Sequence, residues 1–190
     1  MEQPQKRHHL CGTKVKDQKI VLMSGYILAG GQSKRMGTNK ALINFRGVSM
    51  VEHLAMRMNQ AGCTEVFVVG KRKLPIDLPH VLETSPYHHP LYGVARALAH
   101  CTQEYCLIIP CDLPMISIIT LKNIYSSQKY TTIEGQPLLG LFPKNQQEKA
   151  LLYAKQGLSV NAFVEESSKI YIAPHELHNV NFPVDLKDIL

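Results

Sequence analysis

The sequence contains no tryptophan and no apolar run near the roughly 18 residues that a membrane-spanning helix requires. Its aromatic residues do not alternate with basic ones, as they do on surfaces that stack nucleic-acid bases. The sequence also lacks, near its N-terminus, the apolar segment of about 7–15 residues that marks a secretory signal. We therefore expect a protein that neither crosses a membrane nor binds nucleic acid.

Cysteine patterns typical of structural sites are missing too. The five cysteines include no C-x-x-C pair, and an odd number without such a pair fits neither a disulfide framework nor a zinc site. Structural disulfides are rare in compartments that keep thiols reduced. The cytoplasm is therefore the expected location of this protein.

Acidic residues are fewer than basic ones, with 15 Asp and Glu against 21 Lys and Arg, for a net charge of +6. Half of this excess lies in residues 1–20, which show no apolar periodicity. We predict a flexible basic tail over 1–21 and a single domain over 22–190, long enough for a hydrophobic core. Met23, just before the first apolar run, is an alternative start of translation. The mild charge of the domain suits small anionic ligands better than nucleic acid.

Short apolar runs that alternate with amphipathic stretches predict an α/β fold. Four of these runs are expected to be buried strands, at 24–29, 66–69, 81–82 and 105–109. A helix expected at 50–60 lies between the first two, so this part forms a right-handed βαβ unit with a parallel sheet. The runs 130–133 and 138–142 flank a turn and predict a hairpin, which gives the mostly parallel sheet an antiparallel part.

Local signals mark the ends of several helices. Ser49 and Glu52 have the spacing of a capping box at the start of the helix 50–60, and Gly62 is expected to end it. Further helices are expected at 92–100, 118–126 and 145–156, from Ser159 to Glu166, and from Pro183 onward. A late strand is expected at 169–173.

A glycine-rich loop directly follows the strand 24–29. Gly30 and Gly31 permit positive φ and let a ligand approach the main chain closely, while successive backbone N–H groups attract anions. Lys34, Arg35 and Lys40 add positive charge within seven residues. The loop is neither a Walker A sequence nor a G-x-G-x-x-G fingerprint. It predicts a phosphate site, the alternative being an ordinary turn with solvated cations.

Asp112 follows the apolar strand 105–109 and lies between Pro110 and Pro114. Because ligands of such sheets bind at the carboxyl ends of the strands, Asp112 and the glycine loop are expected to share one rim. A carboxylate there is suited to Mg²⁺, which proteins hold with one or two carboxylates and substrate phosphates. The alternative is an Asp that makes a turn or caps a helix. Cys111 beside it would act as a nucleophile only with a nearby base such as His88 or His89.

The sequence LAGGQSKRMGTNK at 28–40 is similar to the L-A-G-G-x-S-x-R-M-G-x-x-K motif of the molybdenum cofactor guanylyltransferases and their nucleotidyltransferase relatives. Four later segments resemble further family segments in the same order: HPLYG at 89–93, PCDLP at 110–114, QPL at 136–138 and NVNFPVDL at 179–186. The resemblance extends over about residues 22–190.

This resemblance implies a three-layer, Rossmann-like nucleotidyltransferase fold. It also implies that the protein transfers GMP from GTP to molybdenum-bound molybdopterin, with Mg²⁺ as the metal and pyrophosphate as the second product. GTP and molybdenum-molybdopterin are thus the expected partners, and transient contacts with molybdenum-insertion or acceptor proteins fit such a role.

The family's functional residues carry over to matching positions of this sequence. Leu28, Ala29 and Gly30 correspond to residues that hold the nucleotide; the full expected nucleotide-binding set is Leu28, Ala29, Gly30, Gly31, Lys40 and Asp112. Arg35, Lys40 and Asp112 are expected to be catalytic, with Asp112 as the metal ligand. Asn179 and Asn181 are expected to contact the pterin substrate or, alternatively, to cap the last helix.

The sequence departs from the family pattern in three places. Val69 and Gly70 stand where a polar residue is usual, Thr84 stands where an Asp contacts the nucleotide, and His89 replaces a Gly. Recognition of the base therefore stays open. A nucleotidyltransferase that uses CTP or another phosphate acceptor, and a nucleotide-binding protein without catalysis, are the alternatives.

Overall fold

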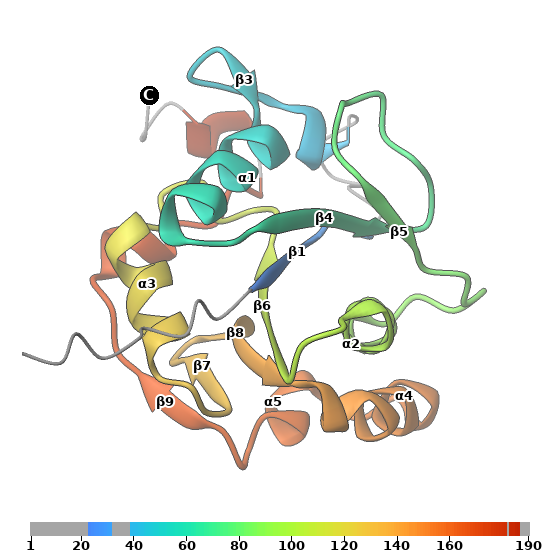
Figure 1. The fold of residues 1–190 in the computed structure, drawn as a ribbon. Helices are drawn as coiled ribbons and strands as arrows, with labels where there is room; N and C mark the ends of the chain where they lie inside the picture. The colour runs from blue at the N-terminus through green and yellow to red at the C-terminus, as the bar shows by residue number, and fades with distance from the viewer. Residues whose placement is uncertain (1–22, 32–38, 182, 187–190) are drawn as a thin grey trace, which may run out of the picture.

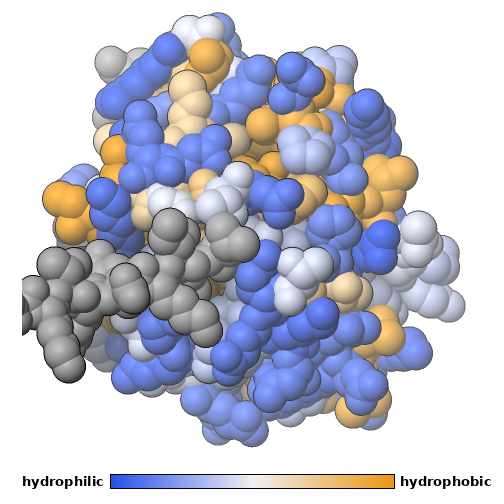
Figure 2. Space-filling model, in the orientation of Figure 1, coloured by the Kyte–Doolittle hydropathy of each residue, from blue (hydrophilic) through white to orange (hydrophobic). Residues whose placement is uncertain are grey.

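The computed structural model describes residues 23–31, 39–181 and 183–186. The predicted tail and the candidate residue Arg35 lie outside these ranges. Among the described residues no helix is long and apolar enough to cross a membrane. Hydrophilic residues cover most of the molecular face in Figure 2, and apolar residues form scattered groups on it.

A seven-stranded sheet forms the centre of the fold, in the order β5-β4-β1-β6-β8-β7-β9. Its strands are β1 (Ser24–Leu28), β4 (Glu65–Gly70), β5 (His80–Leu82), β6 (Tyr105–Pro110), β7 (Thr131–Ile133), β8 (Gln136–Pro143) and β9 (Ser168–Ile170). Neighbours pair in parallel except around β8, which is antiparallel to both β6 and β7. The prediction of a mostly parallel sheet with an antiparallel hairpin is confirmed.

Helices cover both faces of the sheet, which makes three layers (Figure 1). One face carries α1 (Met50–Ala61) and α3 (Ile118–Ser126), and the other carries α2 (Pro90–His100), α4 (Gln147–Gln156) and α5 (Val160–Phe163). Each side has its own buried apolar cluster, to which alternate residues of the central strands contribute. Tyr26 and Ile27 are adjacent in β1 and point into opposite clusters because successive strand residues face opposite sides.

Shorter elements complete the fold. They are the small hairpin of β2 (Asn44–Phe45) and β3 (Val48–Ser49), and the 3₁₀ turns η1 (Lys40–Leu42), η2 (Lys144–Gln146), η3 (Pro174–Leu177) and η4 (Pro183–Leu186). The predicted capping box is confirmed, since the Ser49 side chain accepts from the Glu52 N–H and the Glu52 carboxylate accepts from the Ser49 N–H. Gly62 ends α1 in the left-handed conformation, at φ 116°.

Several predicted boundaries differ from the observed ones. Helix α2 starts at Pro90 rather than residue 92, because the His89 ring caps it by accepting from the Leu91 N–H at 3.3 Å. The helix after Ser159 is a single turn, α5, and does not reach Glu166. The last strand, β9, covers Ser168–Ile170 and stops before residue 173, where its pairing with β7 ends. The predicted last helix does begin at Pro183, where the described residues form the short 3₁₀ turn η4.

The C-terminal ends of β1, β4, β5 and β6 lie at one edge of the sheet because these strands are parallel. Hydrogen bonds continue past the strand ends and hold the segments beyond them together. The Ala29 N–H donates to the Val69 carbonyl at 2.8 Å, and the Cys111 N–H donates to the Leu28 carbonyl at 3.1 Å. The residues that follow three different strands are thereby fixed around one position.

Candidate functional site

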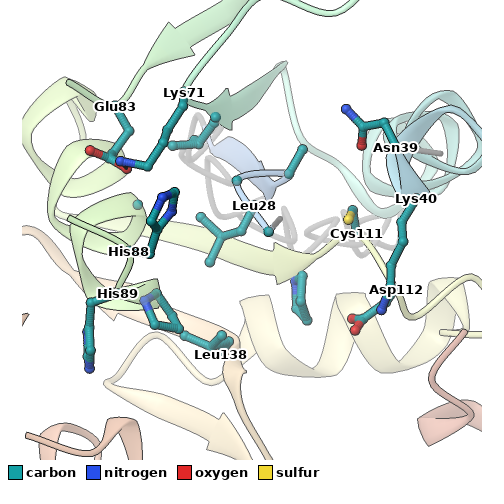
Figure 3. Close-up of a pocket in the computed structure, with 18 of the residues that line it drawn as sticks. Leu28, Asn39, Lys40, Lys71, Glu83, His88, His89, Cys111, Asp112 and Leu138 are labelled. Carbon is teal, nitrogen blue, oxygen red and sulfur yellow. Dashed lines mark ion pairs between the residues drawn. The ribbon is translucent and has the colours of Figure 1, made fainter. Parts of the chain in front are cut away.

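A cavity of about 500 Å³ opens at this edge of the sheet. Its lining includes most of the residues that the sequence singled out: Leu28, Ala29, Gly30, Gly31, Lys40, Asp112 and Asn181. Figure 3 shows Lys40 and Asp112 close together on one side, with Leu28 in the middle. Segments up to 153 residues apart in the chain therefore meet in one pocket, from Leu28 to Asn181.

The two glycines of the loop adopt ordinary backbone conformations. The described glycines with positive φ are Gly47, Gly62, Gly135 and Gly157, so Gly30 and Gly31 do not use the positive φ that glycine permits. Space explains these glycines better. Among the described residues, a Cβ on Gly31 would have no neighbour within 4 Å, and one on Gly30 would reach only the Gly70 Cα at 3.9 Å. A side chain here would project into open cavity rather than strain the fold.

Replacing Gly31 with Ala is therefore expected to leave folding intact and to weaken nucleotide binding about tenfold. The backbone conformation suits Ala, and the lost freedom of the unfolded chain favours the folded state by about 0.4–1 kcal/mol. The added methyl group would occupy space that a phosphate needs. Titration of the purified variant with GTP and a thermal melt measure the two effects.

Gly157→Ala provides the contrast for this experiment. Gly157 ends α4 at φ 68°, so a Cβ there costs about 1–2 kcal/mol in the left-handed conformation and should lower the melting temperature without changing GTP affinity. Wild-type affinity in Gly31→Ala would show that no ligand comes close to this part of the main chain.

Lys40 joins the glycine loop to the C-terminal segment. Its Nζ donates to the Asn181 Oδ1 at 2.6 Å, although 141 positions separate the two residues. The Asn181 N–H in turn donates to the Asp185 carboxylate at 2.6 Å. Asn39 caps the turn η1 by accepting from the Ala41 N–H at 3.2 Å, which fixes the backbone from which Lys40 extends. The ammonium group is thus held at the cavity wall.

Burial raises the pKa of the Asp112 carboxyl group, while the nearby Lys40 ammonium lowers it in part. The backbone is secured as well, because the Val180 N–H donates to the Asp112 carbonyl at 2.9 Å. Within the described ranges no group of three or more His, Cys, Asp or Glu side chains surrounds a metal position. A single hard carboxylate at a phosphate-sized cavity fits Mg²⁺ that takes its remaining ligands from substrate phosphates and water.

The geometry does not support Cys111 as a nucleophile. Burial and the neighbouring Asp112 raise the pKa of its thiol to about 12, so the thiolate is scarce at neutral pH. Figure 3 shows His88 and His89 on the opposite side of the pocket from Cys111. A nucleophilic cysteine needs a base within hydrogen-bond reach, and neither histidine is in a position to serve as that base for Cys111.

The two candidate asparagines differ in position. Asn181 lines the cavity, whereas Asn179 does not and instead accepts a hydrogen bond from the Gln136 Nε2 at 3.2 Å. Asn179 thus joins the hairpin of β7 and β8 to the C-terminal segment. Neither is seen to cap a regular α-helix in the described residues.

An ion pair that the sequence reasoning missed lies across the cavity from Asp112. Lys71 and Glu83 line the pocket and their side chains approach to 3.1 Å (Figure 3). Their positions in the sequence could have indicated this pair. Lys71 comes directly after β4 and Glu83 directly after β5, at the edge of the sheet where ligands bind. Val69, Gly70 and His89 also line the cavity, whereas Thr84 does not.

Comparison with known proteins gives matches over most of the chain. A family model described as a MobA-like NTP transferase domain matches residues 25–162. A probable molybdenum cofactor guanylyltransferase of Bacillus cytotoxicus is 31% identical over 143 residues, which cover 67% of this chain and 71% of that protein.

Solved structures share the fold. A nucleotidyl transferase from Methanothermobacter matches with a TM-score of 0.72 at 18% identity, covering 88% of this chain and 95% of that one. Molybdopterin-guanine dinucleotide biosynthesis protein A from Archaeoglobus fulgidus matches with a TM-score of 0.70 at 16% identity, covering 87% and 96%. At these identities the likeness concerns the arrangement of the elements.

Proposed function

The chain belongs to the MobA-like NTP transferase family, and from that premise we propose that it transfers GMP from GTP to molybdenum-bound molybdopterin and releases pyrophosphate. Its general class is that of an enzyme, a nucleotidyltransferase. One observation carries the finer proposal: the open main chain at Gly30 and Gly31, the Lys40 ammonium and the Asp112 carboxylate meet at a single cavity. These are the groups that a nucleoside triphosphate with a bound metal requires.

The proposed reaction joins two anions. An oxygen of the terminal phosphate of molybdopterin attacks the α-phosphorus of GTP, and the bond to the bridging oxygen of pyrophosphate breaks. The attacking oxygen is already ionised, so the protein needs no strong base. Its task is to align two polyanions and to stabilise the charge that develops between them. We assign this task to Lys40, whose ammonium lies at the cavity wall beside Asp112, and to Arg35 from its motif alone.

Mg²⁺ fits at Asp112, together with oxygens of the triphosphate. Bound there, the ion would neutralise phosphate charge and favour departure of pyrophosphate. The Asp112 carboxylate would orient the triphosphate through this ion, and Asn181 would keep the Lys40 ammonium beside it. We also assign Asn181 a contact with the acceptor, and Asn179 an indirect role through its hydrogen bond to Gln136 in the β7–β8 hairpin.

Pyrophosphate release with a panel of substrates tests the proposal. With Mg²⁺ present, we expect release from GTP only when molybdenum-loaded molybdopterin is added, and release from CTP or ATP at least about tenfold slower, as the loss of one or two base-specific hydrogen bonds implies. Omission of the divalent metal, by addition of a chelator, should abolish the reaction. The products are separated and identified by mass.

The other outcomes of the panel correspond to the alternatives. Faster release from CTP would assign the chain to cytidylyl transfer, and release with a sugar phosphate in place of molybdopterin would replace the acceptor. Nucleotide binding without any release would point to a binding protein. We place the protein in the cytoplasm because Cys63, Cys101, Cys106 and Cys111 are all free thiols.

A further inference from the structure

We propose that Glu83 determines the choice of base, by accepting hydrogen bonds from the N1–H and the 2-amino group of guanine, and that Lys71 positions it. This inference rests on the proposed function, because it takes GTP as the donor nucleotide. It assigns a role to a residue pair that the sequence motifs do not include.

The position of the pair follows from the two ends of the cavity. Lys40, Asp112 and the glycine loop provide charge and open main chain at one end, and Figure 3 shows Glu83 and Lys71 at the other, beyond Leu28. A nucleotide whose phosphates lie near Lys40 therefore directs its base toward Glu83. Leu28, Val69 and Leu138 line the cavity with apolar side chains suited to a flat ring.

Gly93 keeps this space open. It lies in the first turns of α2, and a Cβ built on it would come to 3.4 Å from the Leu28 Cδ2 and 4.0 Å from the Val69 Cγ1. A larger residue at this position would fill the space beside these two side chains, where the ring of a base is expected.

Protein groups surround the Lys71 ammonium. Its Nζ lies 3.1 Å from the Glu83 Oε2 and donates to the Tyr87 carbonyl at 2.9 Å and to the Ser85 carbonyl. Two of the three ammonium donors are thus hydrogen-bonded to the main chain, while the charge faces Glu83. Lys71 therefore acts as a positioning residue that holds the segment after β5 against the end of β4.

Glu83, by contrast, keeps unused acceptor capacity. Its Oε1 accepts from the Ser85 N–H and its Oε2 faces Lys71, whereas a carboxylate has about four acceptor sites. Its side chain is only 9% exposed, so water competes little with a ligand. The two protein contacts fix the plane of the carboxylate at the cavity wall.

The chemistry of the bases makes this arrangement selective. Guanine presents two adjacent N–H donors on its pairing edge, which match the two oxygens of one carboxylate. Adenine and cytosine each present a single amino group beside a ring nitrogen that is an acceptor, and the lone pair of that nitrogen would face a carboxylate oxygen without a hydrogen bond between them. Glu83 lines the cavity and can present this carboxylate to a base, whereas the neighbouring Thr84 does not line it.

Inosine triphosphate is the discriminating probe, because it differs from GTP only by lacking the 2-amino group. We expect the wild-type protein to bind GTP about 10- to 100-fold more tightly than ITP, as a hydrogen bond to a buried charged group implies. In Glu83→Gln the GTP-to-ITP ratio should fall below about threefold, mainly through weaker GTP binding. Equilibrium titration with Mg²⁺ and each nucleotide, without acceptor, measures the ratio.

Glu65→Gln is the matched control, since Glu65 lies exposed at the opposite end of β4 and the change of charge is the same. It should retain the wild-type ratio. Equal binding of GTP and ITP by the wild-type protein would overturn the inference even if Glu83→Gln did not fold, and an unchanged ratio in a folded Glu83→Gln would overturn it as well.

Pyrophosphate release, measured on the same preparations, separates this inference from the proposed function. Selective GTP binding that depends on Glu83, without release in the presence of molybdenum-molybdopterin, would leave the inference standing and reject the function. Pyrophosphate release from GTP and ITP with equal efficiency would support the proposed function and reject the role of Glu83 in the choice of base. A protein that binds neither nucleotide would overturn both.

Discussion

Asp112→Asn is expected to lower turnover by about 10³-fold while leaving the protein at least as stable as the wild type. The amide keeps the size of the side chain but loses the negative charge that would hold Mg²⁺ and the triphosphate. Pyrophosphate release under saturating GTP and Mg²⁺ measures the first effect. Full turnover in this variant would remove Asp112 from the metal site.

The stability half of this prediction follows from the direction of the pKa shift. Burial raises the pKa of Asp112 in the folded protein, so the ionised form is less favourable there than in the unfolded chain. Below the ordinary pKa the group is protonated in both states and costs nothing. As the pH rises from the pKa of Asp112 in the unfolded chain to its higher pKa in the folded protein, the contribution of Asp112 lowers the free energy of unfolding.

Asp112→Asn removes that decrease. Relative to the wild type, the variant should therefore gain stability between mildly acidic and neutral pH, as followed by urea unfolding at several pH values. A variant that loses both activity and stability at neutral pH would instead identify Asp112 as a structural residue of the loop after β6.

Lys40→Met is expected to lower kcat/KM for GTP by about 10²- to 10³-fold, the effect of removing one preorganised charged donor from a reacting phosphate. The variant keeps the length and apolar stem of the side chain. Lys122→Met, a change at an exposed position of α3, is the matched control and should behave like the wild type. Equal kinetics in the two variants would exclude Lys40 from the reaction.

The contact between Lys40 and Asn181 makes a further test of the same prediction. If Asn181 acts by holding the ammonium, Asn181→Ala should cost about tenfold alone and nothing more when Lys40 is already Met, because effects within one hydrogen-bonded pair are not additive. An additive loss in the double variant would instead give Asn181 its own contact with substrate.

Patterns within about a dozen residues predicted most of the fold. The alternation of apolar strands with amphipathic helices predicted the parallel part of the sheet, and the hairpin turn predicted its antiparallel part. The Ser49 capping box and Gly62 marked both ends of α1 correctly. These features are local because helix caps and strand periodicity depend on neighbours in the chain. The rule that parallel strands end at one edge also placed Asp112 beside the glycine loop.

Only the tertiary structure decided the detailed arrangement of the site. Lys40 meets Asn181 across 141 positions, and Lys71 meets Glu83 because β4 and β5 are neighbours in the sheet. The space beside Gly30 likewise depends on Gly70, which lies at the end of a different strand. The sequence by itself determined the elements and the edge at which chemistry gathers. Which side chains pair there depended on packing between distant segments, and no local pattern records such contacts.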